Sequence, residues 1–391
     1  MRIIHTSDWH IGRTFHGSDL KAAHQHYFAH LLELVDRTQP AAVLVSGDVY
    51  DRAIPPVESV ELLHGVIRDL TDRTHVILTA GNHDSATRLG FFRGLTIAQL
   101  HLRTSVRDAA RPVILNADGV RTAVFALPYL SVDNAQRELS LLLGEPPARS
   151  HQAVMDAAVA YLQPRVEQAR TEGADRVMVA AHTFIQGARA ADSERDIRVG
   201  GVDCIAADTF DPLGADYVAL GHLHRPQDVT GAASRTRYSG SPIAFSFSET
   251  RDEKSTSIVQ LTANSEVKVE LIAAPVLHPL VQLRGRIDDV LAENTPAHAW
   301  VRVTLTDPLP PPRAWHRLAQ RFGGLKLLDR DPEGLPVTPT LPHVRGQDGL
   351  EVLEQFVQDV SGQQASPAMV QLLQQAWEAA NAEAANTGVA S

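Results

Sequence analysis

The chain has 391 residues, 44% of them hydrophobic, and a formal net charge of −10 at pH 7. This length is enough for a large core and for two or three domains. Acidic residues outnumber basic ones by 46 to 36, which excludes a protein that holds nucleic acid by a global positive charge. A nucleic-acid enzyme of this composition must gather phosphates locally, through metals, a few arginines or a basic partner.

The same sequence predicts a cytoplasmic protein without a membrane anchor. No uninterrupted apolar run reaches the ~18 residues of a membrane span. We expect no signal peptide, because a strand pattern begins at Arg2. Cys204 is the only cysteine, so no intrachain disulfide can form, as is usual in a reducing compartment.

Short apolar strands and amphipathic helices alternate through the first part of the chain. Strands are expected at 2–7, 42–46, 76–79, 177–181 and 217–220, with helices at about 22–37, 57–71, 87–100 and 153–170. Further strands without long helices are expected at 113–116, 122–127, 237–238, 257–262 and 267–272. The pattern predicts an α/β fold, a mixed two-sheet sandwich flanked by helices. In such folds ligands gather beyond the carboxyl ends of the strands.

The composition changes near Ala274-Pro275, so we expect a first domain at 1–274 and a small α/β domain at 275–330. Its strands are predicted at 280–284, 300–305 and 325–328, and its helices at 287–292 and 313–321. A proline-rich linker at 331–347 follows, and two helices close the chain within 348–391. The first covers about 349–360, and the second begins at Ser366-Pro367. This helical pair either folds back on the main body or docks another protein.

Seven side chains of metal-ligand type follow the ends of these apolar strands. They are Asp8, His10, Asp48, Asn82, His182, His222 and His224. The D-x-H and H-x-H spacings put two ligands on one side of an extended segment, because strand side chains repeat every two residues. Carboxylate, carboxamide and imidazole together suit hard to borderline divalent ions, and a shared carboxylate can hold two of them. Two-metal sites serve the cleavage of phosphate esters, so we expect an enzyme that cuts phosphoester bonds.

The motifs G-D-x-x-D, G-N-H-D and G-H-x-H, in this order, resemble those of the calcineurin-like metallophosphoesterase superfamily. Longer segments at 6–17, 47–56, 219–227 and 238–243 are similar to the SbcD family of bacterial nuclease subunits. The resemblance is strong over about residues 1–274. The small domain and the terminal helices resemble that family in layout more than in motif.

The resemblance implies roles for individual residues. One metal ion is expected on Asp8, His10, Asp48 and His224, and a second on Asp48, Asn82, His182 and His222. Asp48 would bridge them, with Mn²⁺ as the expected ion and Mg²⁺ as the alternative. His83 is implied as the general acid, with Asp51 orienting it. Asp84 is expected to hold its turn or to cap the following helix. Two interpretations stay open for Arg52 and Arg225: they contact substrate phosphates, or they form surface ion pairs.

The resemblance also implies partners. An SbcC-like ABC-type ATPase with a long coiled coil is expected to bind the terminal helices, while the small domain caps the active site. The chain would form a homodimer within a heterotetramer. The implied substrates are double-stranded DNA ends and hairpins, cut by exonuclease and endonuclease activity in repair and recombination.

Two other functions remain open from the sequence. One is a metallophosphoesterase that acts on a small-molecule or protein phosphate ester, and the C-terminal extension argues against it because such an enzyme has no need of a docking element. The other is a non-catalytic scaffold on the same fold. That interpretation predicts missing ligands, whereas all seven are present.

Overall fold

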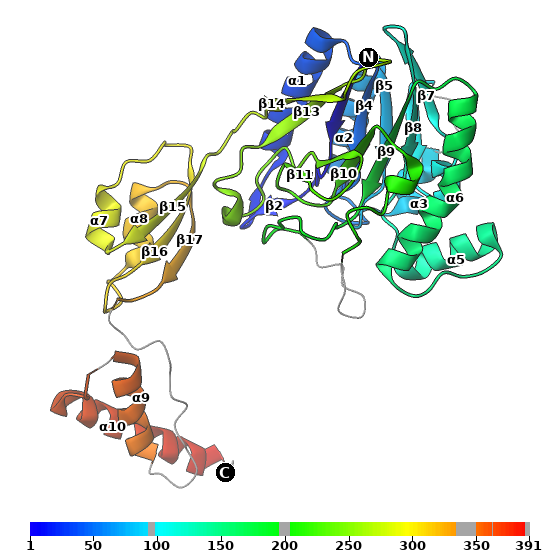
Figure 1. Cartoon of the computed structure of the whole chain (residues 1–391). Helices are drawn as coiled ribbons and strands as arrows, with labels where there is room; N and C mark the ends of the chain where they lie inside the picture. Colours follow the sequence, from blue (N-terminus) through cyan, green and yellow to red (C-terminus); the bar gives the residue numbers. More distant parts are fainter. Residues whose placement is uncertain (93–97, 195–203, 334–348, 362, 388–391) are drawn as a thin grey trace. The chain divides into compact units, whose positions relative to one another are not determined.

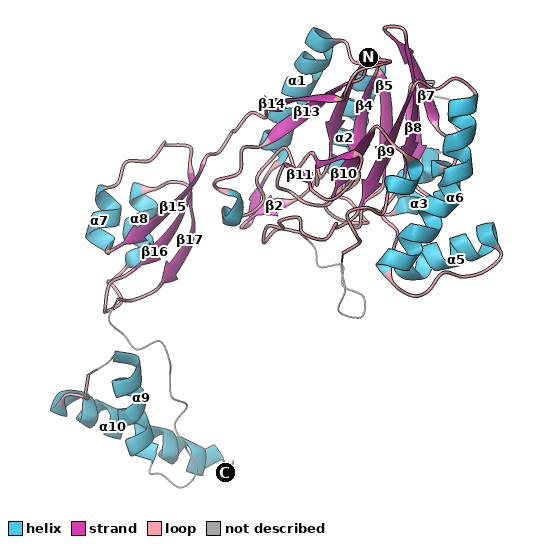
Figure 2. Cartoon of the chain, viewed as in Figure 1, coloured by secondary structure: helices cyan, strands magenta, loops and turns pink. Residues whose placement is uncertain are grey.

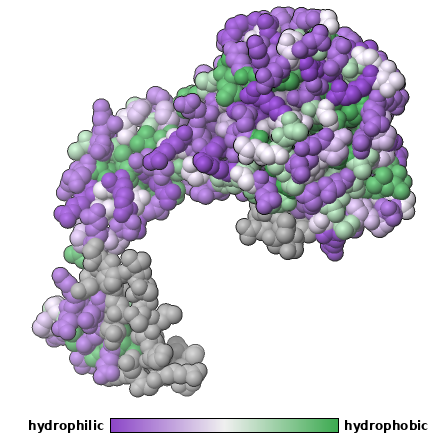
Figure 3. Space-filling model, viewed as in Figure 1, coloured by the Kyte–Doolittle hydropathy of each residue, from purple (hydrophilic) through white to green (hydrophobic). Residues whose placement is uncertain are grey.

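A computed structural model describes residues 1–92, 98–194, 204–333, 349–361 and 363–387. The chain forms two compact units, Met1–Pro279 and Leu280–Ser391 (Figure 1). Among the described residues, no helix has both the length and the apolar content that crossing a membrane requires. The face drawn in Figure 3 is largely hydrophilic, with hydrophobic side chains in separate patches.

The first unit contains two six-stranded sheets, and most neighbouring strands within each sheet are parallel. The first sheet has the order β14 (Lys268–Ala273), β13 (Ser255–Gln260), β1 (Arg2–Thr6), β4 (Ala42–Ser46), β5 (His75–Thr79), β6 (Leu100–Arg103). The second has the order β11 (Gln227–Val229), β12 (Arg235–Tyr238), β10 (Tyr217–Gly221), β9 (Arg176–His182), β8 (Val120–Ala126), β7 (Val113–Ala117). A short hairpin of β2 (Thr14–Phe15) and β3 (Ser18–Asp19) follows the first strand.

Helices pack on the outer faces of both sheets (Figure 2). The first sheet is covered by α1 (Lys21–Thr38) and α2 (Val57–Thr71), and the second by α5 (Val132–Leu143) and α6 (His151–Thr171). Short helical segments complete the unit: α3 (Ala86–Leu89), α4 (Val106–Ala109), η1 (Gly90–Phe92), η2 (Asp211–Leu213) and η3 (Phe247–Glu249). The predicted two-sheet sandwich flanked by helices is therefore confirmed.

The apolar strands lie between two hydrophobic layers, which explains why they carry few polar residues. Ile3, Leu44 and Ile77 face the other sheet, where they join one buried cluster. Their neighbours Ile4 and Val43 face the helices and belong to another buried cluster. Successive strand side chains point to opposite faces, so a strand covered on both faces must be apolar throughout.

The helix predicted at 87–100 was wrong at its C-terminal end. The structure has α3 and η1 there, residues 93–97 lie outside the described part, and Leu100 begins strand β6. The chain leaves the helix near Gly90, which packs tightly against Thr104. A Cβ on Gly90 would lie 2.4 Å from the Oγ1 atom of Thr104, so this close approach requires glycine.

The second unit begins with a parallel sheet in the order β15 (Leu280–Gly285), β16 (Trp300–Leu305), β17 (Leu325–Arg330). Helices α7 (Ile287–Ala292) and α8 (Ala314–Arg321) pack against it around a small core that includes Val303 and Leu318. Two further helices, α9 (Gly349–Ser361) and α10 (Pro367–Thr387), contact each other. Most of the linker predicted at 331–347 lies outside the described residues.

Replacing Ile77 by alanine should destabilise the first unit by about 2–5 kcal/mol, because it leaves a cavity between the two sheets. The control is Leu141→Ala, since Leu141 is 83% exposed and its loss should cost less than about 0.5 kcal/mol. Urea denaturation followed by circular dichroism measures both free energies of unfolding. Equal stability of the two variants would contradict the packing described between the sheets.

Candidate metal centre

All seven predicted ligand side chains meet beyond the carboxyl ends of the central strands. Three clusters come from loops after β1, β4 and β5 of the first sheet, and two from β9 and β10 of the second. The six carboxylates and imidazoles among them are all at most 3% exposed. Burying so many polar groups is costly unless they are paired or coordinate an ion, so the cluster itself indicates a ligand site.

The loops that carry the ligands adopt left-handed backbone conformations that side chains normally avoid. The φ angles are 53° at Asp8, 45° at His10, 50° at Asp48 and 107° at His222. Hydrogen bonds fix these loops to one another: the Asp8 N–H donates to the Gly47 carbonyl at 3.0 Å, and the His10 N–H to the Asp48 carbonyl at 2.9 Å. Such strain clusters at functional sites, where the surrounding structure holds it in place.

Three glycines of the motifs allow main chain and ligands to come this close. A Cβ on Gly47 would lie 2.4 Å from His182 Nδ1, and one on Gly81 would lie 2.1 Å from Asp48 Oδ1. A Cβ on Gly221 would lie 1.9 Å from the Ser46 carbonyl oxygen. The glycines of G-D, G-N-H-D and G-H-x-H are thus required by space, since any side chain would push a ligand out of place.

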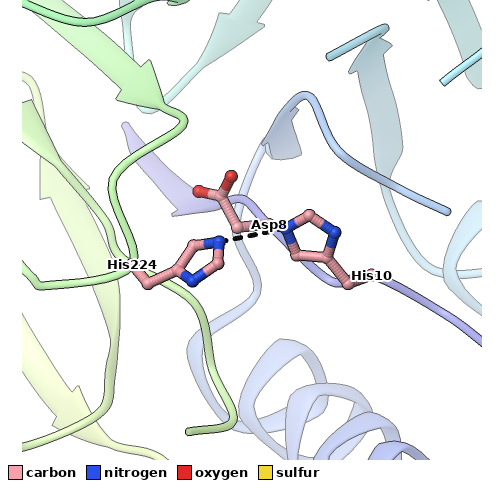
Figure 4. A group of neighbouring side chains, drawn as sticks. All are labelled: Asp8, His10 and His224. Carbon is pink, nitrogen blue, oxygen red and sulfur yellow. Dashed lines mark hydrogen bonds between the residues drawn. The ribbon is translucent and has the colours of Figure 1, made fainter. Parts of the chain in front are cut away.

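Asp8, His10 and His224 form one half of the cluster (Figure 4). The Nε2 atoms of His10 and His224 face each other at 3.0 Å. Burial lowers the pKa of both imidazoles well below the usual range, so both rings are neutral near pH 7. Neutral imidazole nitrogens directed at a common point beside a carboxylate are a set of ligands for a divalent ion.

Asn82, His182 and His222 form the other half. Asn82 Oδ1 lies 2.9 Å from His182 Nε2 and 3.1 Å from His222 Nδ1. Asp48 lies between the halves, because its Oδ2 atom is 3.5 Å from His10 Nε2 and 3.4 Å from His182 Nε2. One carboxylate oxygen therefore reaches both groups of ligands.

Three groups of the cluster shift one another's pKa values. Burial would raise the pKa of Asp48, but His182 and His10 hold it well below its usual range. Burial raises the pKa of Asp8 to about 8, with His182 opposing this and the Asp48 charge adding to it. Burial lowers the pKa of His182, yet Asp48 outweighs this and brings it to about 9. Near pH 7 the Asp48 carboxylate is thus paired with the His182 imidazolium, and Asp8 is mostly protonated. The donor set fits divalent cations, which would take the place of the protons on Asp8 and His182.

His83 lies beside the cluster and is partly exposed. Its backbone N–H donates to Asp48 Oδ1 at 2.9 Å, and its ring packs edge-on against His10 with 4.7 Å between centroids. The predicted orientation by Asp51 needs a correction. His83 Nδ1 donates to the main-chain carbonyl of Asp51 at 2.7 Å, whereas the Asp51 carboxylate lies 3.6 Å from Arg13 Nη1 and 3.9 Å from His10 Nδ1.

Asp84 holds two ligand loops together. Its carboxylate accepts from the backbone N–H groups of Val49, Tyr50 and Gly81 at 2.9–3.0 Å. This joins the loop of Asp48 to the loop of Asn82. Of the two roles expected for Asp84, the structure has the loop-holding one, because Ser85 caps the following helix.

The two flanking arginines differ in their surroundings. Arg225 Nε donates to Asp252 Oδ1 at 2.8 Å, so its guanidinium is already in an ion pair. The side chain of Arg52 is 61% exposed and lies 4.0 Å from Asp51.

A network behind His224 was not anticipated from the sequence. Ser193 Oγ lies 2.6 Å from His224 Nδ1, and Glu194 Oε1 accepts from the His224 backbone N–H at 2.8 Å. Glu249 and Lys254 form a buried pair that contacts Ser193 and the His224 carbonyl. These residues belong to no ligand motif and lie 25–31 positions from His224, so only the fold brings them together.

Comparisons with known proteins identify the family of this chain. A family model described as calcineurin-like phosphoesterase matches residues 1–226, and one described as a type 5 capsule protein repressor C-terminal domain matches 276–361. The SbcD subunit of the nuclease SbcCD from Bacillus subtilis strain 168 is 34% identical over 311 residues, covering 77% of this chain and 78% of its own. The protein of the same name from Escherichia coli K12 is 33% identical, covering 75% and 73%.

A solved structure, the calcineurin-like phosphoesterase YfkN of Bacillus subtilis, covers 70% of this chain and 90% of its own. It has 14% identity and a TM-score of 0.39, a likeness too low to carry an argument. The family model that spans more than half of the chain, and the relatives that match it over three quarters of its length, settle the family. The chain belongs to the SbcD family of nuclease subunits within the calcineurin-like phosphoesterases and is a metal-dependent hydrolase of phosphodiesters.

Proposed function

We propose that this chain is the catalytic subunit of a DNA end-processing nuclease that uses two divalent ions. The observation that carries the proposal is the position of Asp48, a buried carboxylate with one oxygen between imidazoles from the two sheets. One ion would bind Asp8, His10, Asp48 and His224, and the other Asp48, Asn82, His182 and His222. When bound, such a pair lowers the pKa of a water molecule and neutralises phosphate oxygens.

Of the two expected ions, Mn²⁺ is proposed ahead of Mg²⁺. Four imidazoles take part, and Mg²⁺ prefers oxygen ligands and retains its own waters. Imidazole binds the softer transition ions better than it binds magnesium. Mg²⁺ is therefore proposed as a weaker substitute.

His83 is proposed as the general acid that protonates the leaving sugar oxygen. Its Nδ1 atom is committed to the Asp51 carbonyl at 2.7 Å, which fixes the ring and leaves Nε2 as the atom that exchanges a proton. Asp51 would thus act through its main chain, and its carboxylate would orient Arg13 beside the site. His83 is in none of the proposed ligand sets, so its role can be separated from metal binding.

The partners are proposed from the relatives and from the second unit. The relatives are named as the SbcD component of SbcCD, which implies an SbcC component, proposed here as an ABC-type ATPase with a long coiled coil. Residues 275–330 would cap the active site, 331–347 would form the linker, and 348–391 would dock on the ATPase. The docking role is supported by exposed apolar side chains on α9 and α10: Phe356, Met369, Leu372 and Trp377.

Two copies of the chain are proposed to associate within a heterotetramer with two ATPase subunits. Ile54, just before α2, is 66% exposed, and Val57 and Val60, at its beginning, are 76% and 44% exposed. Contiguous exposed apolar side chains of this kind are typical of a protein interface. The partner would also supply DNA-binding surface, which this acidic chain has little of.

Asp48→Ala should abolish metal-dependent cutting of end-labelled duplex and hairpin DNA, because it removes the ligand shared by both ions. The matched control is Asp133→Ala, since Asp133 is an exposed aspartate on α5. Cleavage would be compared with Mn²⁺, Mg²⁺ and EDTA, with a generic phosphate ester in parallel. Activity on the small ester alone would favour a phosphatase, and DNA cutting by the Asp48→Ala variant would refute the bridging role.

His83→Leu should retain both ions and lose about 10²–10⁴-fold in turnover, because it removes a proton donor and no ligand. Calorimetry with Mn²⁺ tests whether the ions are retained, and single-turnover DNA cleavage tests the loss of turnover. His64→Leu, at an exposed histidine on α2, is the matched control. Loss of metal from the His83 variant would show that His83 is a ligand.

Removing residues 346–391 should abolish binding to the ATPase and leave metal binding intact, because the proposed ligands all lie in the first unit. Co-purification and analytical ultracentrifugation with the ATPase measure the first effect, and calorimetry with Mn²⁺ the second. Full affinity of the truncated chain for the ATPase would contradict the docking role of α9 and α10.

A further inference from the structure

A histidine that binds a metal must present a lone pair on one ring nitrogen and find an acceptor for the N–H of the other. His182 meets this need through the main chain, because its Nδ1 donates to the Ser46 carbonyl at 2.8 Å. His224 is built differently. Its Nδ1 faces the hydroxyl of Ser193 at 2.6 Å, and a hydroxyl can either donate or accept.

Glu249 resolves this ambiguity. Ser193 Oγ donates to Glu249 Oε1 at 2.6 Å, which uses the single hydrogen of the hydroxyl. The serine oxygen can then only accept from the ring, so His224 must carry its hydrogen on Nδ1. Its Nε2 atom keeps the lone pair and points at His10 Nε2, 3.0 Å away in the metal cluster (Figure 4).

Two further donors keep the Glu249 carboxylate an acceptor. Lys254 Nζ donates to its Oε2 atom at 2.5 Å, and the backbone N–H of Phe245 donates to Oε1 at 3.1 Å. Glu249 is 1% exposed and Lys254 is 6% exposed. Lys254 also donates to the His224 carbonyl at 2.7 Å, so the ion pair supports both the main chain and, through Ser193, the ring of the same histidine. A buried ion pair is a weak source of stability, which argues for a role in positioning.

The loop that carries Ser193 is itself tied to the site. Arg13 Nη2 donates to the Ser193 carbonyl at 2.7 Å, and Glu194 accepts from the His224 backbone N–H. Ser193 therefore has a fixed position, and its hydroxyl is 2.6 Å from both of its partners. Short hydrogen bonds that involve a charged acceptor are among the stronger ones in proteins.

We propose that Glu249 and Ser193 are positioning residues that fix His224 as the tautomer with hydrogen on Nδ1. They thereby set the metal affinity of the half of the centre formed by Asp8, His10, Asp48 and His224. The other half takes the tautomer of His182 from a main-chain carbonyl and does not depend on this network. The inference rests on the ligand assignment proposed above.

Ser193→Ala in the full chain should weaken binding of one Mn²⁺ ion by about 10–100-fold and leave the other unchanged, as expected when a supporting hydrogen bond to a ligand is lost. Ser193→Thr keeps the hydroxyl and should restore the affinity. Glu249→Gln should repeat the loss, because an amide can donate to Ser193 and reverse the chain of hydrogen bonds.

Ser257→Ala is the matched control, since Ser257 is buried in β13 and its hydroxyl has no partner among the described residues. Calorimetry counts the ions, and melting temperatures report on folding.

A second readout observes the tautomer directly. Long-range proton–nitrogen NMR of the metal-free, ¹⁵N-histidine-labelled chain distinguishes hydrogen on Nδ1 from hydrogen on Nε2. The His224 signals are assigned by their disappearance in His224→Gln. The wild type should show hydrogen on Nδ1, and Ser193→Ala should show hydrogen on Nε2 or a mixture of both.

The outcomes separate the two proposals. If the wild type binds two ions and Ser193→Ala binds both equally well, or both equally weakly, the positioning role is refuted and the ligand assignment stands. Retention of the Nδ1 hydrogen in a folded Ser193→Ala variant also overturns it. A wild-type chain that binds no Mn²⁺ would overturn the ligand assignment and this inference together.

Discussion

The structure of this centre depends on burying two carboxylates, Asp8 and Asp48, where water cannot solvate them. Their neighbours among the ligands are mostly neutral, because burial lowers the pKa of His10, His222 and His224. Only His182 carries a compensating charge, with a pKa raised to about 9. Asp8 is mostly protonated near pH 7 and Asp48 is paired with His182, so a divalent cation would bind by replacing their protons. The rigid walls of the site keep the ligands converging on a common point. Cation binding at this site would therefore be coupled to the release of protons.

The rigidity of the ligand site comes from three local features of the loops at the strand ends. Strained loops place ligands at strand ends, glycines let the loops touch, and Asp84 joins the loop of Asp48 to that of Asn82. The hydrogen bonds between these loops and those to Asp84 satisfy backbone N–H groups that would otherwise need water. The cost of left-handed residues, about 1–3 kcal/mol each, is offset by the cores on both sides of each sheet.

The sequence predicted most of the fold and of the ligand site, because ligand clusters and strands occur together along the chain. Asp48 follows a largely apolar strand, and strands of this kind share a carboxyl edge in α/β folds. It was less informative where tertiary packing decides: Leu100 begins a strand instead of ending a helix, and the Asp51 main chain orients His83. The Ser193–Glu249 link could not be read from one sequence, because no periodicity or motif relates a loop serine to a distant glutamate.

The contact between His10 and His224 has a consequence for the whole chain. These ligands are 214 positions apart in sequence and come from different sheets. An ion held by both would join distant parts of the folded chain, and its binding free energy would add to the free energy of unfolding. This chain has a single cysteine and cannot form an intrachain disulfide to the same end. Coordination would then serve as its cross-link, reversible by a chelator and independent of the redox state of its surroundings.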